Sequence, residues 1–446
     1  MADGAEITSL YQQPAELLRR LIRFDTTNPP GNELACVQFI RETLAAAGIE
    51  STLLARDANR PNLIARLTGR GDAPPLLLQG HVDVVTTEQQ QWTHPPFAAE
   101  VADGYIWGRG ALDMKGGVAM MLAAVLRAKA EGADLPGDVV LCIVSDEEAG
   151  GNDGARFLTE QHKEQFAGIR YALGEFGGFT LYSGARRLYP IMVAEKQSCA
   201  VRATVRGPGG HAALPMHGGA AAKLARFLTR LDHRRLPVHI TPVPKMMVET
   251  VAQTLTPARA RLFRQLLNPP LTNRVLNLLG PFGDTFDPLL HNTVNATIIR
   301  GGEKNNVIPS AITVELDGRM LPGFTPDDML RELRMLAGKD VEFEVIHSDT
   351  NPAAAPDMGL FPVLADALRK GDPEGTAMPN LLAAVTDGRF FTRLGIQTYG
   401  FLPMKLPQGW NFASFVHAAD ERIPVEAMDF GADAIYRVLQ HFGEGK

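Results

Sequence analysis

Short apolar segments in the N-terminal part of the chain end beside acidic residues or histidine, and this pattern constrains the fold most strongly. The segments are Pro75–Gly80 before His81, Val139–Val144 before Ser145-Asp146-Glu147-Glu148, and Tyr171–Leu173 before Gly174-Glu175. Helical patterns separate them, which predicts an α/β fold with a mostly parallel sheet flanked by helices. The carboxyl ends of parallel strands lie at one edge of such a sheet, where ligands bind. We therefore expect these acids and His81 to gather in one site.

Composition excludes several other classes of protein. Apolar residues make up 45% of the 446 residues and charged residues 21%, which is typical of a globular chain. The 44 basic and 50 acidic residues give a net charge of −6, and without a basic stripe we expect no nucleic-acid partner. The Gly207–Gly210 turn lacks the Gly-Lys-Ser/Thr ending of a P-loop, and the absence of a Gly-x-Ser-x-Gly elbow argues against a serine hydrolase.

The sequence also favours a cytoplasmic location. No stretch approaches the roughly 20 apolar residues of a membrane span, so we expect no membrane partner. Met1–Arg20 lacks a basic segment followed by an apolar one, so it does not resemble a signal peptide. Cys36, Cys142 and Cys199 lie in apolar surroundings without a CxxC pair, which predicts buried, reduced thiols.

Residues 195–348 have a different pattern and predict an inserted domain between two parts of the sheet domain, 1–194 and 349–446. The pattern is a strand, a helix, two strands, a helix and a strand, which indicates a small α+β sandwich. Its segments are Gln197–Arg206, Gly218–Leu231, Asn295–Arg300, Ala311–Asp317, Pro326–Ala337 and Val341–Ile346. The connection Leu236–Leu289 is too long for a simple loop, and we expect a partly helical excursion there.

His81 and Asp83 face the same side of an extended strand, so the carboxylate could orient the imidazole for metal binding. Such a triplet is incidental in most sequences. Asp113 lies between Gly110 and Gly116-Gly117, whose small size allows an unusual backbone around the carboxylate. The alternative for Asp113 is an N-cap of the next helix.

Asp146, Glu147 and Glu148 are three adjacent acids behind a buried strand. Their mutual repulsion and desolvation favour a bound cation, although a solvated turn is the alternative. His417 stands in the polar segment His417-Ala418-Ala419-Asp420-Glu421. A single histidine of this kind is more often structural or exposed than a ligand.

Taken together, these segments resemble the M20 family of metallopeptidases, which includes aminoacylases, glutamate carboxypeptidases and desuccinylases. The resemblance covers essentially the whole chain. The motifs that carry it are Gly80–Val85, Trp107–Gly110, Asp113–Gly117, Ser145–Glu148, Glu175, Gly207–His211, Gly301-Gly302, Asn306–Pro309 and His417.

The resemblance implies a role for each polar residue. Asp113 would bridge two divalent metal ions, His81 and Glu175 would complete the ligands of one, and Glu148 and His417 those of the other. Glu147 would be the general base, and Asp83 would orient His81. A base that takes and returns a proton should stay off the metal but within reach of its water. Imidazole and carboxylate ligands suit Zn²⁺, Co²⁺ and Mn²⁺ alike, and Zn²⁺ is the first expectation.

The family also implies that the insertion is a ferredoxin-like lid or dimerisation domain, and hence a homodimer. His211 would reach the active site, often from the partner subunit, and stabilise an oxyanion; a turn histidine is the alternative. Asn295, Arg319 and Arg389 are candidates for binding a substrate carboxylate, and Thr386 and Gly388 for shaping the pocket. Structural salt bridges are the alternative for both arginines.

The predicted function is hydrolysis of an amide or peptide bond next to a free carboxylate, by an N-acyl-amino-acid amidohydrolase or a carboxypeptidase. The substrate would be a small molecule or a short peptide. A dipeptidase or aminopeptidase is the alternative within the family, and by resemblance Glu175 favours the first group because the second more often has Asp there. A non-catalytic metal-binding regulator or scaffold is the alternative of another class, and Glu147 beside a full set of ligands argues against it.

Overall fold

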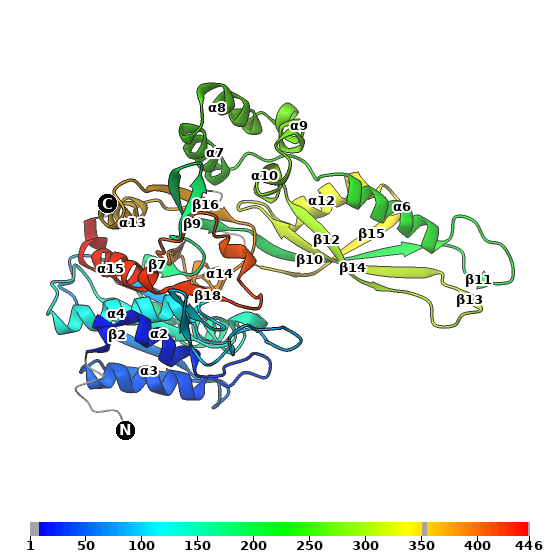
Figure 1. Ribbon diagram of the computed structural model, residues 1–446. Coiled ribbons are helices and arrows are strands. Elements are labelled where there is room, and N and C mark those ends of the chain that lie inside the picture. The colour runs from blue at the N-terminus through cyan, green and yellow to red at the C-terminus, as the bar shows by residue number, and fades with distance from the viewer. Residues whose placement is uncertain (1–8, 350–354, 445–446) are drawn as a thin grey trace. The chain divides into compact units, whose positions relative to one another are not determined.

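A computed structural model of the protein describes residues 9–349 and 355–444 (Figure 1). Residues 1–8, 350–354 and 445–446, which fall within the predicted sheet domain, lie outside the described residues. The chain divides into two compact units. The first comprises Met1–Val193, Asp357–Asn380 and Thr386–Lys446, and the second comprises Ala194–Pro356 and Leu381–Val385.

The large sheet has the strand order β1-β2-β6-β3-β7-β17-β9-β16, and β8 pairs with β9. Its strands are β1 (Ser51–Leu54), β2 (Asn62–Leu67), β3 (Leu76–His81), β6 (Val139–Val144), β7 (Tyr171–Gly174), β8 (Leu181–Ser183), β9 (Arg186–Glu195), β16 (Thr376–Leu382) and β17 (Gln397–Gly400). The neighbours β6, β3, β7 and β17 are parallel. The pairs β1–β2, β2–β6, β17–β9 and β8–β9 are antiparallel.

The sheet is therefore mixed, and the expectation of a mostly parallel sheet is wrong outside its centre. Strands β3 and β6 are buried along their whole length, as their apolar runs predict. An apolar run reports burial and not strand direction. Direction follows from the connections, because a parallel pair needs a crossover of about a dozen or more residues. Only residues 55–61 join β1 to β2, and Gly184-Ala185 joins β8 to β9, so both pairs are antiparallel.

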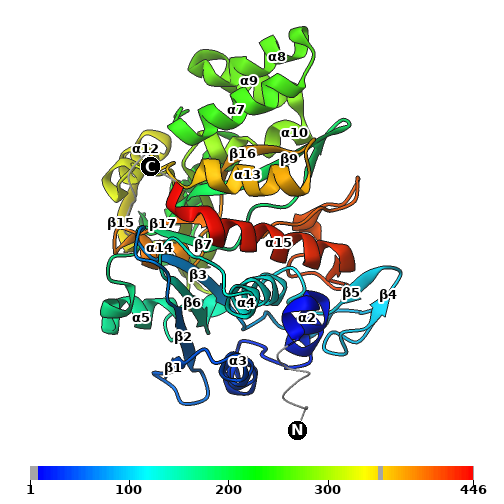
Figure 2. The ribbon, with the colours of Figure 1, turned by 90° about the vertical axis from the view of Figure 1, so that its left-hand side faces the viewer.

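Helices cover both faces of this sheet (Figure 2). On one face lie α4 (Lys115–Ala130), α2 (Pro14–Ile22) and α15 (Val425–His441), which pack against one another. Helix α4 is buried on almost every side, which explains its nearly uninterrupted apolar sequence. On the other face, α5 (Ala155–Gln161) and α14 (Gly388–Thr392) complete an apolar core with residues such as Val140, Leu158 and Phe391. The remaining long helices of the unit are α3 (Leu34–Ala46) and α13 (Phe361–Gly371).

The second unit contains an antiparallel sheet of order β12-β14-β10-β15. Its strands are β10 (Gln197–Arg206), β12 (Thr293–Arg300), β14 (Ala311–Met320) and β15 (Val341–Ser348), and helices α6 (Ala220–His233) and α12 (Pro326–Ala337) pack against it. Burial alternates along β10 and β14, as expected for strands with one face against helices. The predicted strand–helix–strand–strand–helix–strand order is confirmed.

The long connection in this unit is helical, as predicted. It contains α7 (Pro242–Thr254), α8 (Pro257–Phe263), α9 (Pro269–Leu279), α10 (Pro281–Asp284) and α11 (Asp287–Leu290). Residues 381–385 also belong to this unit, unlike the expected boundary, and the Lys196 amide donates to the Leu382 carbonyl. Within the described ranges, no helix is both long enough and apolar enough to cross a bilayer.

Candidate metal centre

Three neighbouring parallel strands deliver candidate ligands to one edge of the large sheet. His81 is the last residue of β3, Glu147 and Glu148 lie in a 3-10 turn just after β6, and Glu175 follows β7 directly. Two further candidates come from loops. Asp113 precedes α4, and His417 precedes β18 (Arg422–Pro424). Residues distant in sequence therefore meet where parallel strands end.

The candidate ligands form two groups that share Asp113. In the first group, His81 Nε2 lies 3.1 Å from Asp113 Oδ1 and 3.5 Å from Glu175 Oε2. In the second, His417 Nε2 lies 3.3 Å from Asp113 Oδ2 and 3.2 Å from Glu148 Oε2. The two oxygens of Asp113 thus face different groups, as a carboxylate between two cations must.

The chemistry of these donors fits divalent cations. All are imidazole nitrogens or carboxylate oxygens, and Glu148 Oε1 is buried with no hydrogen-bond partner among the described residues. Burial raises the pKa of Glu175 to about 7, and it also raises the pKa of Glu148. Acids gathered in a buried place repel one another, and bound cations would offset this repulsion.

The pKa values of the two histidines are also raised, which favours the charged form of each imidazole. Hydrogen bonds with Asp113 and Glu148 raise the pKa of His417 to about 10. Burial alone would lower the pKa of His81, but its contacts with the surrounding carboxylates raise it well above the ordinary value. Since a metal binds only the neutral imidazole, loading this centre would release protons.

Asp83 connects His81 to the turn that carries Glu147 and Glu148. Its carboxylate accepts the Glu147 amide on Oδ1 and the Glu148 amide on Oδ2, each at 3.1 Å. Asn28 Nδ2 donates to Oδ2 at 2.8 Å. His81 Nδ1 lies 2.9 Å from the Asp83 carbonyl and 3.5 Å from Oδ1. Asp83 therefore contacts both the imidazole and the backbone of the turn.

Glu147 belongs to neither donor group among the described residues. Burial raises its pKa well above the ordinary value, and the neighbouring Glu175 adds to this effect. A carboxyl group that lies beside, but outside, a cluster of candidate ligands is placed to accept and return a proton.

A buried ion-pair network behind the turn was not found from the sequence. Asp146 adopts a left-handed backbone (φ 70°), and its Oδ1 accepts Arg60 Nη1 at 2.8 Å. Arg60 Nη2 also donates to Glu33 Oε1 at 2.7 Å. The sequence contains no local signal for this network, because 86 residues separate Arg60 from Asp146.

The segment Thr386–Arg389, which leads into α14, contacts the turn after β6. Arg389 Nη2 donates to the Gly150 carbonyl at 3.1 Å, and its guanidinium lies 4.6 Å from the Phe390 ring centre. Thr386 Oγ1 accepts the Gly388 amide at 3.0 Å. The buried Asp387 carboxylate has no hydrogen-bond partner among the described residues, and burial raises its pKa to about 7. The predicted substrate contacts of this segment stay predictions.

The other three candidates lie in the second unit. His211 is exposed in β11 (Gly210–His211), which pairs with β13 (Val307–Ile308), and its Nδ1 accepts the Ala213 amide at 3.2 Å. Asn295 is exposed on β12. Arg319 on β14 donates to Asp317 through Nε at 2.9 Å and Nη2 at 3.0 Å. Their predicted roles toward the substrate stay predictions.

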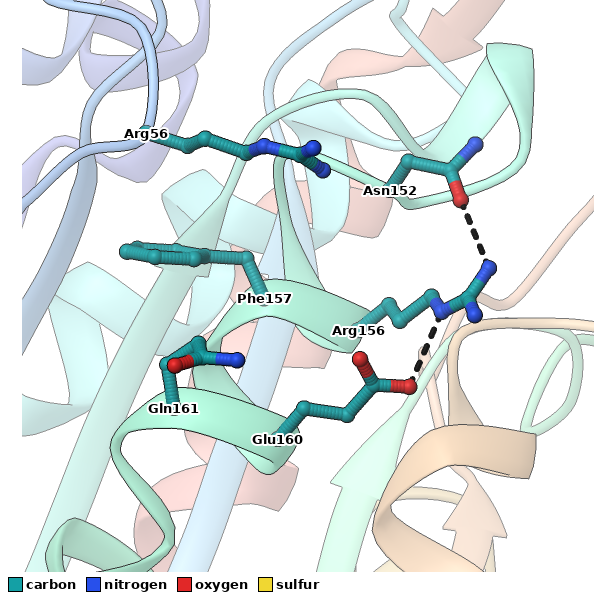
Figure 3. A pocket seen from close by; sticks show the side chains of 6 residues that line it. All are labelled: Arg56, Asn152, Arg156, Phe157, Glu160 and Gln161. Carbon is teal, nitrogen blue, oxygen red and sulfur yellow. Dashed lines mark hydrogen bonds and ion pairs between the residues drawn. The ribbon is translucent and has the colours of Figure 1, made fainter.

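A surface pocket near α5 is separate from the donor groups. Figure 3 shows its lining residues, Arg56, Asn152, Arg156, Phe157, Glu160 and Gln161, none of which is a candidate ligand. Arg156 donates to Asn152 Oδ1 at 3.1 Å and to Glu160 Oε1 at 2.9 Å, so an acid in the pocket already neutralises it. This pocket is not the metal centre.

Comparison with known proteins decides the family. Residues 77–441 match the model of "Peptidase family M20/M25/M40", which spans both donor groups. The chain belongs to this family. The resemblance predicted from the motifs is thereby confirmed, and this M20/M25/M40 protein is an enzyme of the metallopeptidase and amidohydrolase class, not the non-catalytic metal binder considered as an alternative.

The relatives of this M20/M25/M40 peptidase differ in their substrates. Human aminoacylase-1 is 27% identical over 95% of this chain and 93% of its own length. An M20 family metallo-carboxypeptidase from Sulfolobus solfataricus has the same fold, with a TM-score of 0.66 and 17% identity over 97% of this chain and 99% of its own. Human carnosine dipeptidase 1 has a TM-score of 0.63 and 16% identity over 99% of this chain and 98% of its own.

Proposed function

We propose that this M20/M25/M40 peptidase uses two divalent cations to hydrolyse an amide or peptide bond next to a free carboxylate. The observation that carries the proposal is the arrangement of two donor groups that share Asp113, with Glu147 beside them and in neither. Zn²⁺ is the first candidate cation, with Co²⁺ and Mn²⁺ as alternatives. Human aminoacylase-1 and the Sulfolobus carboxypeptidase support the substrate class by their names alone.

The residues of the chain would divide the reaction between them. Cations bound in the two groups would supply water activation and carbonyl polarisation. Glu147 takes the proton of the attacking water and returns it to the leaving amine, and its raised pKa suits both steps. Asp83 accepts the amides of Glu147 and Glu148 and thereby holds the backbone of the turn that carries both side chains.

Further roles are proposed on the family resemblance. The second unit would act as a lid or dimerisation domain, with His211 stabilising the oxyanion. Asn295, Arg319 and Arg389 would bind the substrate carboxylate, and Thr386 and Gly388 would shape its pocket. Arg389 and Arg319 have partners in Gly150 and Asp317, so a substrate carboxylate would have to share or displace these contacts. A homodimer and a cytoplasmic location are predictions from the sequence.

The neighbouring glutamates provide the test of the base. We expect Glu147→Gln to retain both cations while turnover falls by a factor on the order of 10²–10⁴, since the amide cannot accept a proton. Glu148→Gln is the matched control and should lose one cation, because it removes a ligand. Metal analysis of the purified variants and their turnover give the two readouts. Near-wild-type turnover of Glu147→Gln would refute the assignment.

A substrate panel separates the proposed activity from that of a dipeptidase or aminopeptidase. N-acyl amino acids with a free carboxylate should be hydrolysed, and the same compounds as carboxamides should not. Dipeptides with a free amine would be preferred by the alternative enzyme. The panel is best run on metal-stripped protein reloaded with Zn²⁺, Co²⁺ or Mn²⁺, so that the choice of cation is measured together with the choice of substrate.

A further inference from the structure

Glu421 is the last residue of the loop that carries His417, and its fully buried side chain contacts the loop that carries Asp113. Its Oε1 accepts the amides of Leu112 at 2.7 Å and Asp113 at 3.1 Å. Its Oε2 accepts the Gly110 amide at 3.0 Å and Arg109 Nη1 at 2.7 Å. All four donors therefore come from the loop that ends at Asp113.

The loop that carries His417 is in turn held by side chains from elsewhere in the chain. Arg109 Nη2 donates to the His417 carbonyl at 3.3 Å, and Gln90 Nε2 donates to the same oxygen at 2.9 Å. The Gly108 amide donates to the Glu421 carbonyl at 2.9 Å. Just beyond, β18 pairs with β5 (Tyr105–Trp107). Arg109 and Glu421 thus link the two loops in both directions.

The two donor groups differ in how their ligands are supported. His81 ends a buried strand and Glu175 follows another, so hydrogen bonds of the sheet fix both positions. His417 belongs to no strand or helix, and its backbone adopts a left-handed conformation (φ 61°). Its position relative to Asp113 depends on the contacts of its loop. Residues behind the ligands orient them in metalloproteins, and loss of such a residue commonly weakens metal binding.

We infer that Glu421, paired with Arg109, is a positioning residue that sets the spacing between Asp113 and His417 and thereby the affinity for the cation of the second group. The inference rests on the proposed two-cation function and deepens it. The carboxylate acts through the backbone amide of Asp113, and Arg109 acts through the carbonyl of His417. Neither side chain contacts the substrate or a cation in this assignment.

The test compares Glu421→Gln with Asp372→Asn in the full-length protein. Asp372 is also a buried carboxylate paired with an arginine, Arg187, but it contacts no candidate ligand. Zn²⁺ stoichiometry and affinity are measured by equilibrium dialysis with metal analysis, starting from metal-stripped protein. We expect Glu421→Gln to weaken the second Zn²⁺ by about 10–100-fold and the first by less, because the sheet still holds His81 and Glu175, and we expect Asp372→Asn to keep both affinities. Turnover number should fall with little change in KM.

The outcomes are distinguishable. Wild-type protein that binds a single Zn²⁺ would contradict the two-cation function itself, before any variant is considered. The positioning role would be overturned if wild-type protein binds two Zn²⁺ and Glu421→Gln binds both with unchanged affinities. If Glu421→Gln does not fold, Arg109→Gln provides the test. This variant removes the hydrogen bond to the His417 carbonyl and leaves the amides of Leu112 and Asp113 bound to Glu421. Unchanged affinities in Arg109→Gln then overturn the inference.

Discussion

Two buried aspartates near the candidate base have opposite environments. Asp83 accepts three hydrogen bonds, from Asn28 and from the amides of Glu147 and Glu148. Although burial opposes it, the contacts with His81 and Asn28 hold the pKa of Asp83 below its ordinary value. Asp387 has no such donor among the described residues, and burial raises its pKa to about 7. The same side chain is therefore stable as an anion in one place and as a neutral acid in the other.

Asp387 should make the stability of the metal-free protein depend on pH. Its folded pKa, about 7, lies above the ordinary value of 3.8, so its protonated form favours the folded state. This contribution is fully present below pH 3.8 and is lost as the pH rises through about 7. We expect wild type to lose stability relative to Asp387→Asn across that range. Urea unfolding of both proteins at several pH values, with chelator present, measures the difference, and parallel curves would contradict it.

The candidate ligands could be proposed from the sequence, whereas the residues that contact them from behind could not. Polar residues at the ends of apolar strands, together with the family motifs, singled out the residues of both donor groups. Asn28, Arg60 and Glu421 were missed as partners because their contacts with Asp83, Asp146 and the Asp113 loop join residues 55 to 311 positions apart. Composition and periodicity describe local structure, and a single sequence has no signal for such pairs.

At the scale of elements, helix α14 packs against the turn that follows β6. Gly150 and Gly151 both have left-handed backbones, with φ of 106° and 73°. A Cβ atom on Gly151 would lie 2.5 Å from Asp387 Oδ1 and 2.8 Å from Phe390 Cε2. Arg389 bonds to the Gly150 carbonyl from the same helix. The turn that carries the candidate base is thus shaped by a helix that starts more than 200 residues later, which no local pattern could predict.

Gly151→Ala should displace the turn and impair the reaction. The added methyl group has no room against α14, and a displacement of about 1 Å near a reacting group can lower turnover by about 100-fold. Gly184→Ala is the matched control, since Gly184 also has positive φ (63°) but nothing within 4 Å of its Cβ position. We expect Gly184→Ala to lower stability slightly and leave turnover unchanged. Equal turnover in the two variants would mean that the turn tolerates the displacement.

At the scale of the whole chain, the donors come from four separate stretches of the first unit, around residues 81, 113, 148–175 and 417. The second unit is inserted between the last two of these stretches. Sequence periodicity predicted this insertion because its half-buried strands alternate, whereas the central strands of the first unit are continuously apolar. Residues 381–385 were predicted to belong to the sheet domain, whereas the structure places them in the second unit. Five residues are too few to show the periodicity of a strand or a helix.

Cation binding should stabilise the first unit by joining its distant stretches. A ligand that binds only the folded state adds about 2.7 kcal/mol to the free energy of unfolding at 100 times its Kd. We expect Zn²⁺ to slow hydrogen exchange in β3, β6 and α15, with a smaller effect in β10 and β14 of the second unit. His417→Ala should reduce this protection, whereas Glu147→Gln should keep it. Equal protection with and without chelator would argue against a bound cation.

The order of the donors along the chain also decides when each group can first exist during synthesis. His81, Asp113 and Glu175 are all made before the second unit begins, whereas His417 follows it. A chain still attached to the ribosome can therefore hold every donor of one group while the other lacks its histidine. If His417 binds the second proposed cation, that cation could be captured only after the inserted unit has been translated. A product truncated before residue 417 would then lack one candidate ligand of the second group.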